Sequence, residues 1–142
     1  MTDLVTATIT RLGELKPTTL TQVAGLLALN SLVRPPIDKM PAAYVLPGDR
    51  RYGLVNGLVN AVRQLGSQAV TIILLVGSRS PVGDDVFNPI GDLESAVIGK
   101  LLGWQPDAEF GPLLYAAGRL IDVQSLFFTY QMTFSRDHTV RA

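Results

Sequence analysis

The chain has 142 residues, of which 47% are hydrophobic and 17% are charged. Its 12 basic residues balance 12 acidic ones, so no overall electric field draws it to nucleic acid or to an anionic membrane. The absence of cysteine excludes a disulfide scaffold, a thiol nucleophile and a cysteine-based zinc site. Average soluble domains carry about 25% charged residues. Two interpretations of the low charge therefore stay open: a partner subunit covers apolar surface, or a well-filled core lies beneath neutral polar side chains.

We expect a single soluble domain over residues 1–142. The segment Met1–Val5 lacks the basic and apolar regions of a signal peptide. The longest apolar run, 72–77, is far too short to span a bilayer. No internal repeat and no low-complexity segment interrupts the chain.

The N-terminal part of the chain predicts a helix, a short strand and a second helix. Over residues 3–15 apolar side chains recur with helical spacing, and Pro17 forbids continuation of that helix. Residues 20–23 suit a short strand. Residues 24–33 are rich in Ala and Leu and favour a buried helix that ends before the prolines that follow.

The middle of the chain predicts two strands that flank a loop. Residues 42–46 form a continuous apolar run between two prolines, which is typical of a short strand buried on both faces. Residues 48–57, rich in glycine and charge, are predicted to be a loop. Residues 58–65 are ambiguous, because their apolar side chains have helical spacing. Gly66-Ser67 resembles a hairpin turn before the clear strand at 69–76, so we predict an antiparallel strand at 58–65.

The last part of the chain predicts a polar loop, a helix and a β-hairpin. The loop covers 78–88, and the helix covers 89–103, with Asn88 as its cap. The hairpin strands are predicted at 113–121 and 125–135.

In the second hairpin strand large apolar residues alternate with Thr, Gln and Ser, so one face is buried. The polar residues 136–142 are expected to form a loose tail. Because hairpins dominate and βαβ alternation is absent, we expect an α+β fold with a mainly antiparallel mixed β-sheet flanked by helices.

The sequence offers little chemistry for catalysis. His138 is the one histidine, and it lies in the predicted tail without the partner that a catalytic histidine needs. Asp84, Asp85, Asp92 and Glu94 have oxygen ligands that suit Ca²⁺ or Mg²⁺, but a solvated loop and a favourably charged helix N-terminus explain them better. No phosphate-binding loop or nucleophile motif occurs. We therefore expect no enzymatic activity, no metal and no cofactor, with a small ligand- or metal-binding domain as a less favoured alternative.

Two groups of residues are candidates for a protein interface. Arginine pairs such as Arg50-Arg51 suit carboxylates across a subunit interface. The outer face of the last strand carries Phe127 among polar residues, and if that strand lies at the sheet edge it must be paired or covered. The predicted interface residues are Arg50, Arg51, Arg79, Asp84, Asp85, Phe127, Thr129 and Gln131.

Four segments in order resemble the small tail terminator proteins of long-tailed phages, including the Mu-like minor tail proteins. They are residues 41–47, residues 60–64 with the strand after them, residues 92–94 leading to 102–106, and residues 113–120 leading into 127–128. The resemblance covers the predicted core and leaves most of the chain before residue 41 unmatched.

The resemblance implies a tail-terminator-like fold and assembly into a hexameric ring. Such a ring would cap the head-proximal end of the tail tube, stop its polymerisation and offer a docking surface to the head or neck. The implied partners are other copies of the chain, the tail tube protein and a neck or head-completion protein, with DNA only passing through the lumen and no membrane contact. The implied location is the virion tail, after assembly in the host cytoplasm. Another neck or tail-completion protein is the alternative.

Overall fold

The computed structural model describes residues 3–16, 19–25, 29, 40–58, 61–77, 87–123 and 127–141. In chain order their elements are α1 (Leu4–Leu12), η1 (Gly13–Leu15), β1 (Gln22–Gly25), β2 (Ala42–Leu58), β3 (Ala61–Gly77), α3 (Phe87–Leu101), β4 (Leu114–Val123) and β5 (Phe127–Arg141).

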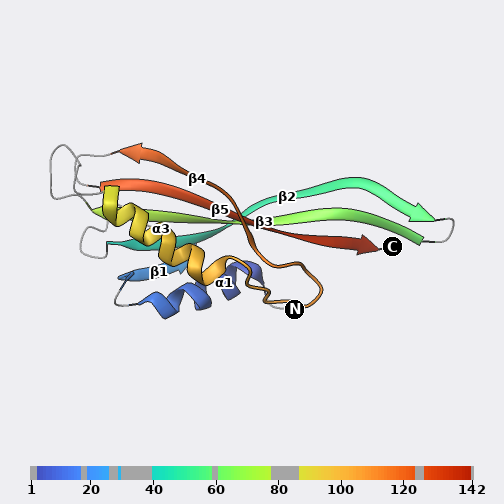
Figure 1. Cartoon of the computed structure of the whole chain (residues 1–142), viewed down its shortest axis with the longest axis horizontal. Coiled ribbons are helices and arrows are strands. Elements are labelled where there is room, and N and C mark those ends of the chain that lie inside the picture. The colour runs from blue at the N-terminus through green and yellow to red at the C-terminus, as the bar shows by residue number, and fades with distance from the viewer. Residues whose placement is uncertain are drawn as a thin grey trace.

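The strands form one mixed sheet in the order β1-β2-β3-β5-β4. Strand β1 runs parallel to β2, and every other pair of neighbours is antiparallel. Helices α1 and α3 lie across one part of this sheet (Figure 1). The α+β class with a mainly antiparallel mixed sheet flanked by helices is thus confirmed.

The sheet consists of a body, which carries the helices, and a projecting arm (Figure 1). We define the arm as residues 50–58 of β2, 61–68 of β3 and 136–141 of β5, which pair with one another as a three-stranded ribbon. Leu58 pairs with Ala61 near the tip. Strand β4 ends its pairing with β5 before the arm begins, so the arm extends beyond the layer of helices.

The main hydrophobic core lies between the helices and the sheet. Helix α3 contributes Leu93, Val97 and Leu101, which are buried and lie on one stripe because they are four residues apart. Helix α1 contributes Leu4 and Leu12. Alternate residues of three strands complete this core: Ala43, Val45, Val70, Ile72, Leu74, Val76, Phe128, Met132 and Phe134.

A smaller apolar cluster lies on the opposite face of the sheet. It contains Ala42, Tyr44, Ile73 and Leu75, with Phe127 packed against it. Because neighbouring residues of β2 enter different clusters, the start of this strand is buried on both faces, as the sequence predicted. The alternation predicted for β5 is also confirmed, since its large apolar residues from Phe128 onward face the helices.

The loop predicted at 48–57 is wrong, because β2 continues through these residues to Leu58. Pairing with β3 holds them extended, although the register shifts twice. A Cβ atom on Gly48 would lie 2.8 Å from the Cβ of Ala69. At this position glycine therefore permits close approach of two strands rather than a turn.

The turn predicted at Gly66-Ser67 is also wrong, because both residues lie inside β3. The predicted strand is confirmed for residues 61–65, where it continues unbroken into the next predicted strand. The antiparallel partner of this strand is instead β2, whose Leu58 pairs with Ala61.

Three predicted boundaries also change. Residues 136–141 belong to β5 rather than to a loose tail. Residues 24–25 belong to β1, and the rest of the second predicted helix, apart from Leu29, lies outside the described residues. Helix α3 begins at Phe87, so Asn88 lies within the helix instead of capping it.

Candidate assembly surface

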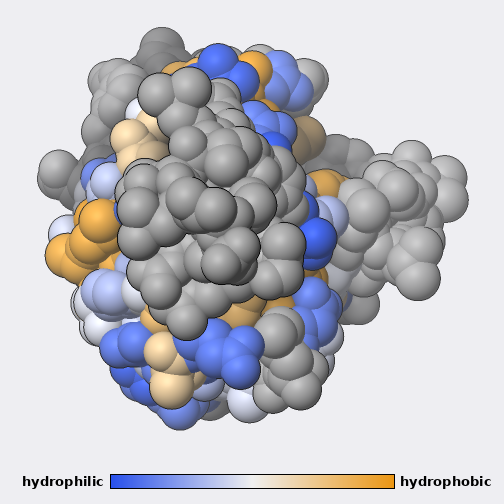
Figure 2. All heavy atoms as spheres, turned by 90° about the vertical axis from the view of Figure 1, so that its right-hand side faces the viewer, coloured by the Kyte–Doolittle hydropathy of each residue, from blue (hydrophilic) through white to orange (hydrophobic). Residues whose placement is uncertain are grey.

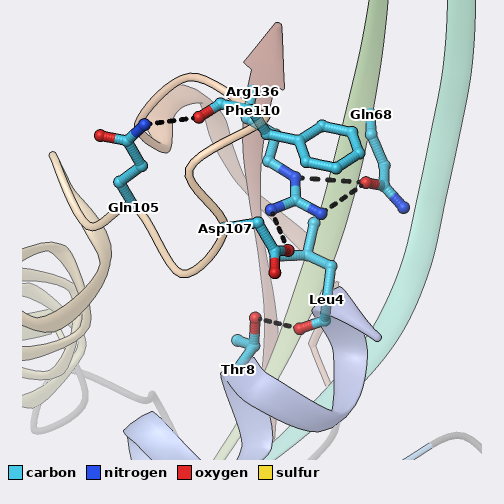
Figure 3. Close-up of polar contacts among 7 residues, drawn as sticks. All are labelled: Leu4, Thr8, Gln68, Gln105, Asp107, Phe110 and Arg136. Carbon is cyan, nitrogen blue, oxygen red and sulfur yellow. Dashed lines mark hydrogen bonds and ion pairs between the residues drawn. The ribbon is translucent and has the colours of Figure 1, made fainter. Parts of the chain in front are cut away.

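We call the start of the arm, where Arg50, Gln68 and Arg136 lie side by side on β2, β3 and β5, the arm root. A buried arginine fixes it (Figure 3). The Arg136 side chain is 1% exposed, and its Nη1 lies 3.1 Å from Oδ2 of Asp107. Its Nε and Nη2 donate to Oε1 of Gln68 at 3.2 and 2.9 Å. The Phe110 ring covers the guanidinium at 4.0 Å. This constellation, which we call the clamp, joins β3, β5 and the segment between α3 and β4.

Further contacts hold that segment, residues 102–113, against the arm. The Gly111 N–H donates to the Asp137 carbonyl of the arm at 2.8 Å. Within the segment, the side chain of Gln105 donates to the Phe110 carbonyl at 2.7 Å. His138 lies 4.9 Å from the Phe110 ring, centroid to centroid. The sequence places His138 in a loose tail, whereas the structure packs it against Phe110 near the arm root.

Strand β4 is the edge of the sheet next to β5. The exposed large hydrophobic residues among those the structure describes are Leu102, Leu114, Leu120 and Ile121, with 41–55% of their surface accessible. Three of the four lie on β4. Seen from the arm end, the coloured part of the surface carries both hydrophobic and hydrophilic residues (Figure 2). A ten-residue edge strand with exposed apolar side chains is typical of an interaction surface.

A hydrogen-bonded cluster links α3 to β4 and β5. The hydroxyls of Tyr115 on β4 and Tyr130 on β5 both donate to Oε2 of Glu94, each at 2.7 Å. The Tyr115 ring also stacks on Phe134 at 4.9 Å. A Cβ atom on Gly118 would lie 2.9 Å from the same Glu94 oxygen and would collide with the Tyr115 hydroxyl. Glycine at this position therefore leaves room for the cluster.

The environment of this cluster raises the pKa of both phenols. Burial and the hydrogen bond to Glu94 raise the pKa of Tyr115, and the hydrogen bond to Glu94, followed by burial, raises the pKa of Tyr130. The native state then holds both protons more tightly than the unfolded state does. The resulting stabilisation is fully present below the ordinary tyrosine pKa of 10.0 and is lost as the pH rises through the native values.

An alkaline titration followed by phenolate absorbance checks this assignment. We expect Glu94→Gln to lower the pKa of Tyr115 and Tyr130, because the substitution removes the negative charge that opposes phenolate formation. Tyr44 is an internal control, since burial alone raises its pKa and the substitution should leave its titration unchanged. Identical titration curves for the two proteins would show that Glu94 does not hold these phenols.

The structure describes the side chains of four predicted interface residues, three of which lie together on β5 and one on β2. Phe127, Thr129 and Gln131 lie on the face of β5 away from the helices, and Thr129 is 8% exposed. Strand β5 lies between β3 and β4, so the edge is β4 instead. Arg50 is exposed on β2, where the arm begins. Of the others, Arg79, Asp84 and Asp85 lie outside the described residues, as does the side chain of Arg51.

Sequence reasoning missed both polar constellations. It treated Glu94 as part of an acidic cluster, whereas the structure pairs Glu94 with two tyrosines. Among the described residues, no three His, Cys, Asp or Glu side chains gather to hold a metal ion. No helix in that part of the chain is long and apolar enough to cross a membrane.

Comparisons with known proteins relate the whole described fold to one family. Residues 3–142 match the family described as phage tail terminator protein. A search of curated proteins finds no match. Among solved structures, a chain from the "Virion of native gene transfer agent (GTA) particle" is similar, with a TM-score of 0.50 and 13% sequence identity over 94% of this chain and 93% of that chain. At this identity the structural likeness shows a shared fold.

Proposed function

The chain belongs to the phage tail terminator protein family, and from this premise we propose that it caps the head-proximal end of a phage tail tube. It is a structural protein of the phage tail. In the proposed role it binds the last ring of tube subunits, terminates their polymerisation and offers its other side to the head or neck. The family match over nearly the whole chain is the observation that carries this proposal.

The proposed assembly is a homohexameric ring with DNA passing through its lumen. A ring closes through head-to-tail contacts, so each subunit needs two different surfaces that fit each other. The arm and the edge strand β4 are candidates for these two surfaces, because they belong to different parts of the sheet (Figure 1). This geometry supports ring closure rather than a two-fold dimer.

The proposed site of action is the virion tail, which the protein joins after synthesis in the host cytoplasm. Its partners there are the tail tube protein and a head-completion or neck protein. The exposed apolar residues of β4 support burial of this flank in an assembly. A role elsewhere in the neck would use the same fold but a different partner. Binding to the tail tube therefore distinguishes the capping role from the neck role.

A tube polymerisation assay tests the capping role directly. Purified chain is added to growing tubes of the cognate tube protein, and tube lengths are measured by negative-stain electron microscopy. We expect shorter tubes, with added density at one end, as the amount of chain increases. Unchanged lengths and bare ends, while the chain still binds a neck protein, would support the neck alternative and contradict the capping role.

A further inference from the structure

We propose that Glu94, held by Tyr115 and Tyr130, accepts the guanidinium of Arg50 from a neighbouring copy of the chain. The arm root of one subunit would thereby dock beside the edge strand β4 of the next. The inference rests on the ring assembly proposed above, and it assigns the charged contact of that ring to named side chains.

Glu94 is prepared to receive a further donor. Both tyrosine hydroxyls bind the same oxygen, Oε2, and an ionised carboxylate has acceptor sites on both oxygens. The ion pairs between described residues are Lys100 with Glu14 and Arg136 with Asp107, so neither contains Glu94. The two phenols fix the carboxylate in one orientation, which reduces the entropy lost when a partner binds.

Arg50 has the complementary properties. Arg50 is exposed on β2. It lies opposite Gln68 of β3 in the sheet, and Gln68 lies opposite Arg136 of β5. The clamp neutralises Arg136 through Asp107, whereas neither described ion pair includes Arg50. An arginine fork can bind a carboxylate through two parallel hydrogen bonds.

The partner is a second copy because the two groups cannot meet within one chain. Glu94 of α3 is bonded to Tyr130 of β5, whereas Arg50 aligns across β3 with Arg136 of β5. Arg136 lies six residues along the strand from Tyr130, which is roughly 20 Å at about 3.3 Å per residue and beyond the reach of an arginine side chain. A contact from Arg50 of one copy to Glu94 of the next joins two different surfaces. Repeated around an axis, such a contact closes a ring.

Charge reversal tests this pairing in particles that lack the gene and receive it from a plasmid. The readout is the number of normal-length tails joined to heads. We expect Arg50→Glu and Glu94→Arg each to reduce that number roughly tenfold or more, because like charges then face each other across the interface. The double variant restores opposite charges across the interface and should recover part of the complete particles. Recovery is incomplete because an arginine at position 94 cannot accept the hydrogen bonds of Tyr115 and Tyr130.

Two control variants make the result specific. Lys16→Glu reverses an exposed basic residue that follows η1, outside both β4 and the arm, and should have little effect. Glu94→Gln retains a hydrogen-bond acceptor for both tyrosines without the charge, so it should weaken assembly, and thermal unfolding of the purified variant separates that effect from any loss of stability. Unaffected single variants, or a double variant as defective as the singles, would overturn the pairing. Wild-type chain that restores no normal-length tails would instead contradict the proposed function itself.

Discussion

Arg136→Met is expected to lower the free energy of unfolding by about 3–5 kcal/mol, the usual loss when one member of a buried ion pair is removed. The Arg136 side chain is 1% exposed, and Asp107 is 16% exposed. The substitution leaves that carboxylate and the Gln68 amide oxygen without their donors in a desolvated place. Denaturant-induced unfolding of the purified protein measures the change.

The ion pair between Lys100 and Glu14 is the matched control. Its atoms lie closer together, at 2.6 Å, but its side chains are 31% and 54% exposed. Lys100→Met should therefore cost far less than Arg136→Met, because water screens the pair. Replacing Arg136 and Asp107 together by apolar residues should recover part of the loss, since no charge remains buried alone. Equal small losses for Arg136→Met and Lys100→Met would contradict the structural role assigned to the clamp.

Phe134→Ala is expected to destabilise the protein by about 3–5 kcal/mol, because it removes a large side chain from a packed core. Phe134 is fully buried between the sheet and the helices, and its ring stacks on Tyr115 at 4.9 Å. The substitution would leave a cavity beneath the tyrosine that donates to Glu94. Thermal and denaturant unfolding measure the loss.

Thr133→Ala tests whether the register of β5 is correct. Thr133 is the next residue along the strand, is half-buried and points to the other face, so its loss should cost less than about 1 kcal/mol. A shift of the register by one residue would exchange the faces of these two side chains. Comparable losses for both substitutions would therefore contradict the observed pairing of β5 with β3 and β4.

Much of the body could be predicted because its signals are local. The first helix, the buried start of β2 and the alternation of β5 follow from apolar spacing within a few residues. The three buried leucine and valine residues of α3 have the same kind of signal. Each of these patterns specifies which face is buried, and the helix-covered sheet follows from it.

The arm was missed because its stability comes from distant pairing. Residues 48–57 carry glycines that favour loops, yet β3 pairs with them along the whole ribbon. Residues 136–141 look like a polar tail, but Arg136 is neutralised by Asp107, 29 residues earlier in the chain. Local propensity cannot include such partners.

The candidate assembly surface could not be predicted, because it depends on the order of the strands in the sheet and the sequence does not specify that order. Strand β5 is the last strand in the chain, but β4 pairs along its outer side and forms the edge of the sheet. The same strand order places Tyr115 beside Glu94, which lies 21 residues earlier in the chain. The sequence indicates Glu94 only as a possible oxygen ligand in an acidic cluster. Its tyrosine partners, Tyr115 and Tyr130, could be identified only from the paired strands.

Electron microscopy of particles made without this gene tests the central claim most directly. If the chain terminates the tail tube, tails grow to abnormal and variable lengths and remain unattached to heads, and supplying the wild-type chain restores uniform tails on heads. Tails of normal length that fail to join heads would contradict termination and indicate a head-joining role instead.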